Sequence, residues 1–183
     1  MFNIMYADKY DTIYYVNNGL MPVRDAAPQY DWRKTVPGNT SATLWTSFRS
    51  FTQLPQYLNP KSGIVFNTNH TSFAASGKND NLNPANFPKV DGWETYHNNR
   101  SIRVYELLDN EKLSYERFKQ IKFDKQLPNQ LAYPYNIDSM LLLKADDYPQ
   151  LKKIISTFQQ WDRKGDSSSK GAAIFLLTYE HVK

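Results

Sequence analysis

The chain has 183 residues, a length that fits one domain or most of one, and 40% of them are hydrophobic. Its formal net charge of +4 comes from dispersed rather than clustered basic residues, which argues against nucleic-acid binding. There are no cysteines, so disulfides, Cys-ligated metals and thiol catalysis are excluded. No stretch approaches the ~18–20 apolar residues that a membrane-spanning helix needs, and no signal peptide opens the chain.

The first half of the chain has the pattern of β-strands joined by long loops. Residues 2–7 and 12–17 are rich in aromatic and β-branched side chains and are separated by a short turn, so they predict a β-hairpin. A third strand is expected over 64–67. The proline-rich segment 20–60 and the asparagine-rich segment 71–90 predict irregular loops. Loops of such length usually have a function or wrap a larger body.

The second half of the chain predicts helices. One is expected over 98–108, capped by an asparagine at its start, and a second after the cap Ser114. The clearest pattern covers 147–161, with Asp147 as its cap and apolar residues at helical spacing. Residues 172–182 are apolar enough for a buried final helix. Strands first and helices later indicate an α+β fold, not a βαβ alternation.

Two asparagines at the end of the predicted third strand are candidate site residues. A side-chain amide such as that of Asn67 or Asn69 can donate a hydrogen bond into a cleft. An acyl-transfer enzyme needs such a donor where negative charge develops on a carbonyl oxygen. Asparagine is also a common turn residue, because it bonds its own backbone and tolerates left-handed conformations. These residues alone leave both interpretations open.

Arg100 is a second candidate, at the start of the helix predicted over 98–108. A cation at a helix N-terminus opposes the helix dipole, so this placement is unfavourable without an anionic or carbonyl partner. A solvated arginine is the alternative interpretation. The nearby Arg103 could equally be the residue in use.

Other catalytic and binding motifs are absent from the sequence. The three histidines, His70, His97 and His181, lack the spacing of a helical metal site. There is no glycine-rich dinucleotide or phosphate loop and no Gly-x-Ser-x-Gly nucleophile elbow. The sequence therefore offers no local signature of metal, nucleotide or serine-elbow chemistry.

A series of short motifs occurs in the same order as in a known enzyme family. They are Tyr6-Ala7-Asp8-Lys9, Ile13-Tyr14-Tyr15, Pro22-Val23-Arg24, Trp32-Arg33, Pro37-Gly38, Leu54-Pro55, Asn59-Pro60-Lys61-Ser62-Gly63, Asn67-Thr68-Asn69, Asn98-Asn99-Arg100, Trp161-Asp162-Arg163 and Ser169-Lys170-Gly171-Ala172-Ala173. Through this series essentially the whole chain resembles the penicillin amidase family, particularly its acyl-homoserine-lactone acylase-like branch.

The resemblance implies an N-terminal-nucleophile hydrolase with an αββα sandwich that cleaves the amide bonds of N-acylated small molecules. In this family a precursor cuts itself to expose a serine whose own α-amino group acts as the base, directly or through water. By the resemblance, Asn69 donates its side-chain amide to the oxyanion. Arg100 matches the active-site arginine that helps order the site.

The resemblance also implies that residues 1–183 are a central fragment of the family's β chain. The nucleophilic serine of the family lies upstream of the Tyr-Ala-Asp-Lys strand, and Ser41, Ser47 and Ser62 are internal and lack a free amine. We therefore expect the isolated chain to be inactive. The expected partners are an N-acylated small-molecule substrate and the remaining α- and β-chain segments.

No cofactor is expected for catalysis, but the resemblance implies a structural calcium in the complete protein. Most of its ligands would lie outside this segment. Asp80 and the carbonyl of Trp32 are the positions here that could contribute, and neither is assigned. Complete members of the family are commonly exported to the periplasm, whereas this sequence carries no signal that gives its location.

A second interpretation is a non-catalytic module. An aromatic-rich, mildly basic domain with thirteen tyrosines could bind a hydrophobic or sugar ligand or a complementary chain. Exposed strand edges at the start of the chain would favour self-association.

Overall fold

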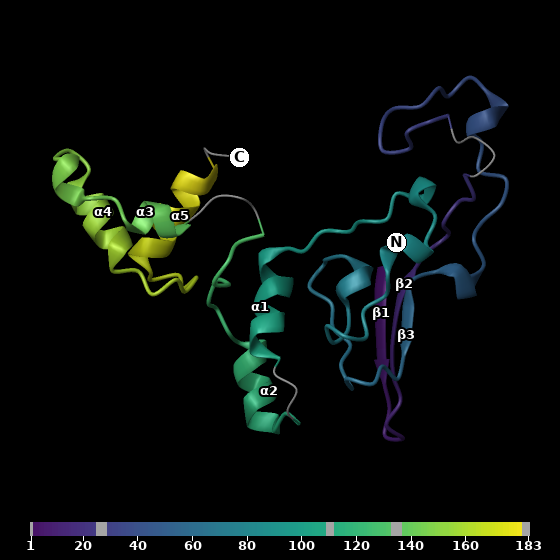
Figure 1. Cartoon of the computed structure of the whole chain (residues 1–183), viewed down its shortest axis with the longest axis horizontal. Coiled ribbons are helices and arrows are strands. Elements are labelled where there is room, and N and C mark those ends of the chain that lie inside the picture. Colours follow the sequence, from purple (N-terminus) through teal and green to yellow (C-terminus); the bar gives the residue numbers. More distant parts are fainter. Residues whose placement is uncertain (1, 25–28, 109–111, 133–136, 181–183) are drawn as a thin grey trace. The chain divides into compact units, whose positions relative to one another are not determined.

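The computed structural model describes residues 2–24, 29–108, 112–132 and 137–180 (Figure 1). It divides into two compact units, Met1–His97 and Asn98–Lys183. A small antiparallel sheet lies in the first half of the chain and α-helices lie in the second, so the α+β prediction is confirmed. The αββα sandwich stays a prediction for the complete protein.

The sheet of the first unit contains β1 (Phe2–Ala7), β2 (Ile13–Asn18) and β3 (Gln56–Leu58), with β2 in the middle (Figure 1). The predicted β1–β2 hairpin is confirmed. Successive strand residues point to opposite faces, and both faces of β2 are buried at its centre. Tyr15 packs with a cluster on one face, and Val16 packs with a second cluster on the other.

The third strand differs from the prediction over 64–67. Val65 forms only an isolated bridge with Ser76, and the strand that completes the sheet is β3, where Tyr57 pairs with Tyr15. Tyr57 is 5% exposed, and its hydroxyl donates to the carbonyl of Ser72 at 2.9 Å. Burial of Tyr57 beside Tyr15 therefore favours the pairing of β3 with β2. A strand of three residues is too short to show this pairing in its own hydrophobic pattern.

The second unit contains α1 (Asn99–Leu107), α2 (Tyr115–Lys122), α3 (Ile137–Leu141), α4 (Lys152–Gln159) and α5 (Lys170–Glu180). The caps predicted for the first two helices are confirmed. The side chain of Asn98 accepts from the Ser101 N–H, and that of Ser114 accepts from the Arg117 N–H. No helix in the described part of the chain is long and apolar enough to cross a membrane.

The predicted helix over 147–161 is wrong at both ends. Asp147 ends a separate turn of 3-10 helix, so it does not cap α4, which begins five residues later at Lys152. Trp161 lies beyond the end of α4 and packs in the core of this unit with Phe158 and Phe175. Of the apolar residues in the predicted helix, Ile155, Phe158 and Trp161 are buried, whereas Leu151 and Ile154 are each 48% exposed.

The final helix is buried along one side only. Ala172 and Phe175 of α5 lie in the core, whereas Leu176 and Leu177 are 59% and 65% exposed. The predicted final helix is therefore present, but only one side of its described residues is buried. The last residues of that prediction, 181–182, lie outside the described part of the chain.

Candidate functional site

Asn69 occupies a tight turn that its neighbours define. Its backbone has a φ of +56°, in the left-handed region that asparagine tolerates better than most residues. Its N–H donates to the Oδ1 of Asn67 at 2.9 Å. The same Oδ1 accepts from the Nδ2 of Asn3 on β1 at 3.0 Å. Asn67 therefore supplies the turn that asparagine-rich strand ends are expected to make, and it ties that turn to the sheet.

The exposed side chain of Asn69 lines a cavity of about 500 Å³ in the first unit. Much of the remaining wall is polar, with the side chains of Asn3, Asn17, Thr71 and Ser72. Several of these side chains are already bonded within the protein: the hydroxyl of Thr71 donates to the Glu94 carbonyl at 2.7 Å, and Thr71 and Ser72 are only 3% and 4% exposed. A larger cavity, of about 880 Å³, lies in the same unit, but Asn69 does not line it.

The wall of the Asn69 cavity also contains unsatisfied polar atoms. The Oδ1 of Asn17 and the Nε1 of Trp93 are buried and have no hydrogen-bond partner in the described part of the chain. Burying such atoms without a partner is costly, and native structures seldom do so without a reason. The Nδ2 of Asn17 is in contrast bonded to the Oγ of Ser72 at 2.7 Å.

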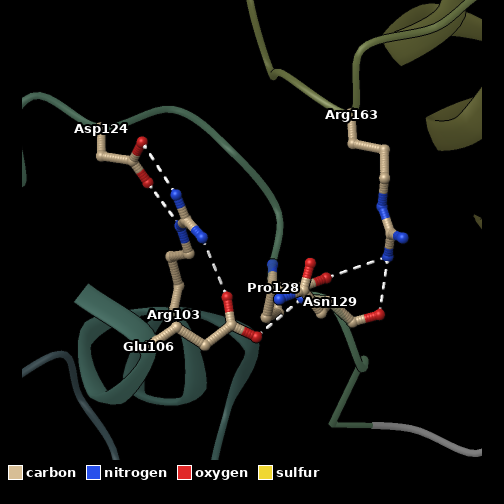
Figure 2. Close-up of polar contacts among 6 residues, drawn as sticks. All are labelled: Arg103, Glu106, Asp124, Pro128, Asn129 and Arg163. Atoms are coloured by element: carbon tan, nitrogen blue, oxygen red, sulfur yellow. Dashed lines mark hydrogen bonds and ion pairs between the residues drawn. The ribbon is translucent and has the colours of Figure 1, made fainter.

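Arg100 is the second residue of α1 and is exposed, whereas Arg103 is engaged inside its own unit. Arg103 donates to the two oxygens of Asp124 at 2.7 and 3.3 Å and to Glu106 at 2.9 Å (Figure 2). The hydrogen bonds with Asp124 are the main reason that the pKa of Arg103 is raised. The sequence left open which arginine serves a site, and these contacts assign Arg103 to internal ion pairing.

The ion pairs of Arg103 extend into a wider network (Figure 2). Glu106 also accepts from the backbone N–H of Asn129 at 2.8 Å. Arg163 donates to the carbonyls of Pro128 and Asn129, each at 2.9 Å. The network therefore fixes α1, which carries Arg100, against the loop that contains residues 128–129.

The two candidate residues lie in different units: Asn69 in the first and Arg100 in the second. Asn69 lies in a turn bonded to Asn67, and Arg100 lies in the first turn of α1. Their roles toward an oxyanion stay predictions.

Two of the three histidines are described, and both lie in the first unit. His70 is 4% exposed, and its ring stacks on Phe66 with centroids 4.8 Å apart. The ring of His97 lies 6.3 Å from that of His70, and burial lowers the pKa of His97. His181 lies outside the described residues. The sequence left the histidines between a disfavoured metal trio and an ordinary surface or core role, and nothing in it marked His70, which directly follows Asn69, as buried.

The calcium that the resemblance implies stays a prediction for the complete protein. No group of three or more histidine or acidic side chains among the described residues lies close enough to hold a metal ion. The carboxylate of Asp80 accepts from the backbone N–H of Ser62.

The family model described as penicillin amidase matches residues 1–183, the whole chain.

Proposed function

Because the chain belongs to the penicillin amidase family, we propose that it contributes oxyanion-stabilising residues to a hydrolase of linear N-acyl amides. Family membership supports an amide hydrolase. The position of Asn69 carries the finer proposal, because its side chain is exposed at a cavity while its backbone is held in a bonded turn. A preorganised donor of this kind stabilises charge without reorganising during the reaction.

In the proposed reaction, a serine oxygen attacks the carbonyl carbon of the substrate amide, and the carbonyl oxygen becomes an oxyanion. The Nδ2 of Asn69 donates a hydrogen bond to that oxyanion. Collapse of the tetrahedral intermediate expels the amine, which takes up a proton, and water then hydrolyses the acyl-enzyme. The base is the free α-amino group of the serine, which the family resemblance implies.

The nucleophile in this proposal comes from outside residues 1–183. An N-terminal nucleophile needs a free α-amino group, and internal serines such as Ser41, Ser47 and Ser62 have none. Arg100 is proposed to help order the site. Its assignment is supported by the engagement of Arg103 with Asp124 and Glu106.

The test is the Asn69→Ala substitution in the complete enzyme that contains this chain. We expect a loss of about 10²–10³ in kcat, as for other single oxyanion donors. Release of 4-nitroaniline from an N-acyl-4-nitroanilide measures it. Asn86→Ala, at another exposed asparagine of the first unit, is the control and should stay within about twofold of the parent.

Two results would contradict the proposal. One is a near-parental kcat for Asn69→Ala, and the other is robust amine release by the isolated 183-residue chain. A panel of N-acyl-homoserine lactones and penicillins then separates quorum-signal degradation from antibiotic-related acylase activity, two narrower roles that fit the same chemistry.

A further inference from the structure

We infer that His70 is a positioning residue that holds the Asn69 turn in the geometry needed for oxyanion binding. The inference rests on the proposed function. It starts from the burial of His70, whose side chain is 4% exposed although it directly follows the exposed Asn69. A buried imidazole requires partners for its ring nitrogens, and here both partners belong to the loop that carries Asn69.

The hydrogen bonds of His70 fix its tautomer. The backbone N–H of Thr68 donates to Nδ1 at 3.2 Å, and the Thr68 hydroxyl lies 3.0 Å from the same nitrogen. At the other side of the ring, Nε2 lies 2.9 Å from the carbonyl oxygen of Ala74. A backbone N–H can only donate and a carbonyl can only accept. The ring is therefore neutral, with its proton on Nε2.

These contacts bracket Asn69 along the chain. Thr68 immediately precedes it, and Ala74 ends the short 3-10 turn Ser72–Ala74 that follows. The ring of His70 thus ties together the two ends of the loop, and it rests on Phe66, whose backbone N–H donates to the Ala75 carbonyl at 2.9 Å.

This support favours the conformation of Asn69. A φ of +56° is uncommon at a residue other than glycine; asparagine tolerates it better than most residues, and hydrogen bonds around it favour it further. The side chain of Asn67 holds the N–H of Asn69 from one side. The ring of His70 accepts from the N–H of Thr68, the residue that precedes Asn69. Loosening the loop would displace the amide donor of Asn69 from the oxyanion.

The experiment is a double-mutant cycle in the complete enzyme. His70→Phe keeps the ring and its stacking but removes both hydrogen bonds. His70→Asn restores an acceptor near the position of Nδ1, where it can receive the Thr68 N–H. Each substitution is made in the parent and in the Asn69→Ala background, and kcat, KM and the unfolding midpoint are measured for all of them.

If His70 acts through Asn69, His70→Phe lowers kcat about ten- to a hundredfold, because small misplacements of a catalytic group are costly. KM stays within about twofold, since the oxyanion contact forms mainly in the transition state. His70→Asn recovers at least about threefold of the lost kcat, and in the Asn69→Ala background His70→Phe costs less than about threefold.

A control separates positioning from general stability. Tyr14→Phe removes a partly buried hydrogen bond of the first unit away from the Asn69 cavity, from the Tyr14 hydroxyl to the Oε1 of Gln56 at 2.7 Å, so it should lower the unfolding midpoint while leaving kcat nearly unchanged. Equal losses from His70→Phe in both backgrounds would overturn the inference, as would a parental kcat for His70→Phe beside an impaired Asn69→Ala. If His70→Phe does not fold, His70→Asn and His70→Gln carry the same cycle.

The same data keep the two proposals apart. A parental kcat for Asn69→Ala rejects the proposed oxyanion role and the positioning inference with it. An impaired Asn69→Ala with additive losses in the cycle rejects only the role of His70.

Discussion

Arg100 and Arg103 lie on the same helix, α1, but their surroundings differ. Arg103 is a half-buried centre of ion pairs with Asp124 and Glu106, whereas Arg100 is exposed at the start of the helix. We expect Arg103→Ala to lower the free energy of unfolding by about 1–3 kcal/mol, because it leaves partly buried carboxylates without their donor. Urea denaturation of the chain measures this loss.

The matching substitution, Arg100→Ala, should change the free energy of unfolding by no more than about 0.5 kcal/mol, as is usual for an exposed position. In the complete enzyme it should lower kcat about ten- to a hundredfold, because a residue that orders the site acts on the geometry of the reacting groups. The reverse pattern, with Arg103 controlling kcat and Arg100 controlling stability, would exchange the two assignments.

At the scale of elements, a glycine on α5, Gly171, allows this helix to pack closely against Trp161, which follows α4. A Cβ at Gly171 would overlap the side chain of Trp161, whose indole Nε1 donates to the Lys164 carbonyl at 2.9 Å. We expect Gly171→Ala to destabilise the protein by about 1–3 kcal/mol through overpacking, despite the better helix propensity of alanine. Thermal or urea unfolding measures the change.

Gly38→Ala is the matched control for this prediction, because no atom lies within 4 Å of a Cβ at that position and its φ is not in the left-handed region. There the substitution should be neutral or stabilise by up to about 1 kcal/mol, since it restricts the unfolded chain. Equal stability of the two variants would show that α5 does not depend on close contact with Trp161.

Local sequence predicts correctly the elements that depend on residues close together in the chain. The caps Asn98 and Ser114 bond backbone groups three residues away, so their patterns are complete in a short window. β3 escaped prediction because its pairing depends on Tyr15, far away in the sequence. The start of α4 was predicted too early in the chain, because Asp147 has the sequence pattern of a helix cap but belongs to a separate 3-10 turn.

In the candidate site, too, short stretches of sequence did not identify the residues that depend on distant parts of the chain. Asn69 and Arg100 were proposed through the ordered motif series, not through local pattern alone, because an asparagine in a turn and an arginine on a helix are common. The role of His70 could not be read from sequence, since it depends on which backbone groups the folded loop brings to each ring nitrogen. The hydrogen bonds that hold the loop around Asn69 are therefore known only from the folded structure.

At the scale of the whole molecule, the described sheet has an open edge. β1 pairs with β2 on one side only, and its six residues carry no charge. Phe2 is 82% exposed, Met5 51% and Ile4 44%. Long, uncharged edge strands of this kind pair readily with other chains, and natural proteins commonly protect them with charges or cover. We therefore propose that the isolated chain self-associates through β1.

Ile4→Lys tests this proposal, because a lysine on an edge strand opposes pairing with a second strand. We expect it to raise the apparent dissociation constant at least about tenfold, which corresponds to about 1.4 kcal/mol. Sedimentation velocity over a range of concentrations measures it. Leu177→Lys replaces a leucine on α5 that is 65% exposed and should leave association unchanged.

A chain that stays monomeric, or equal weakening by both substitutions, would mean that association does not depend on the edge of β1. In the complete enzyme a segment that pairs with β1 would remove this edge, so there Ile4→Lys should instead weaken assembly with the remaining segments.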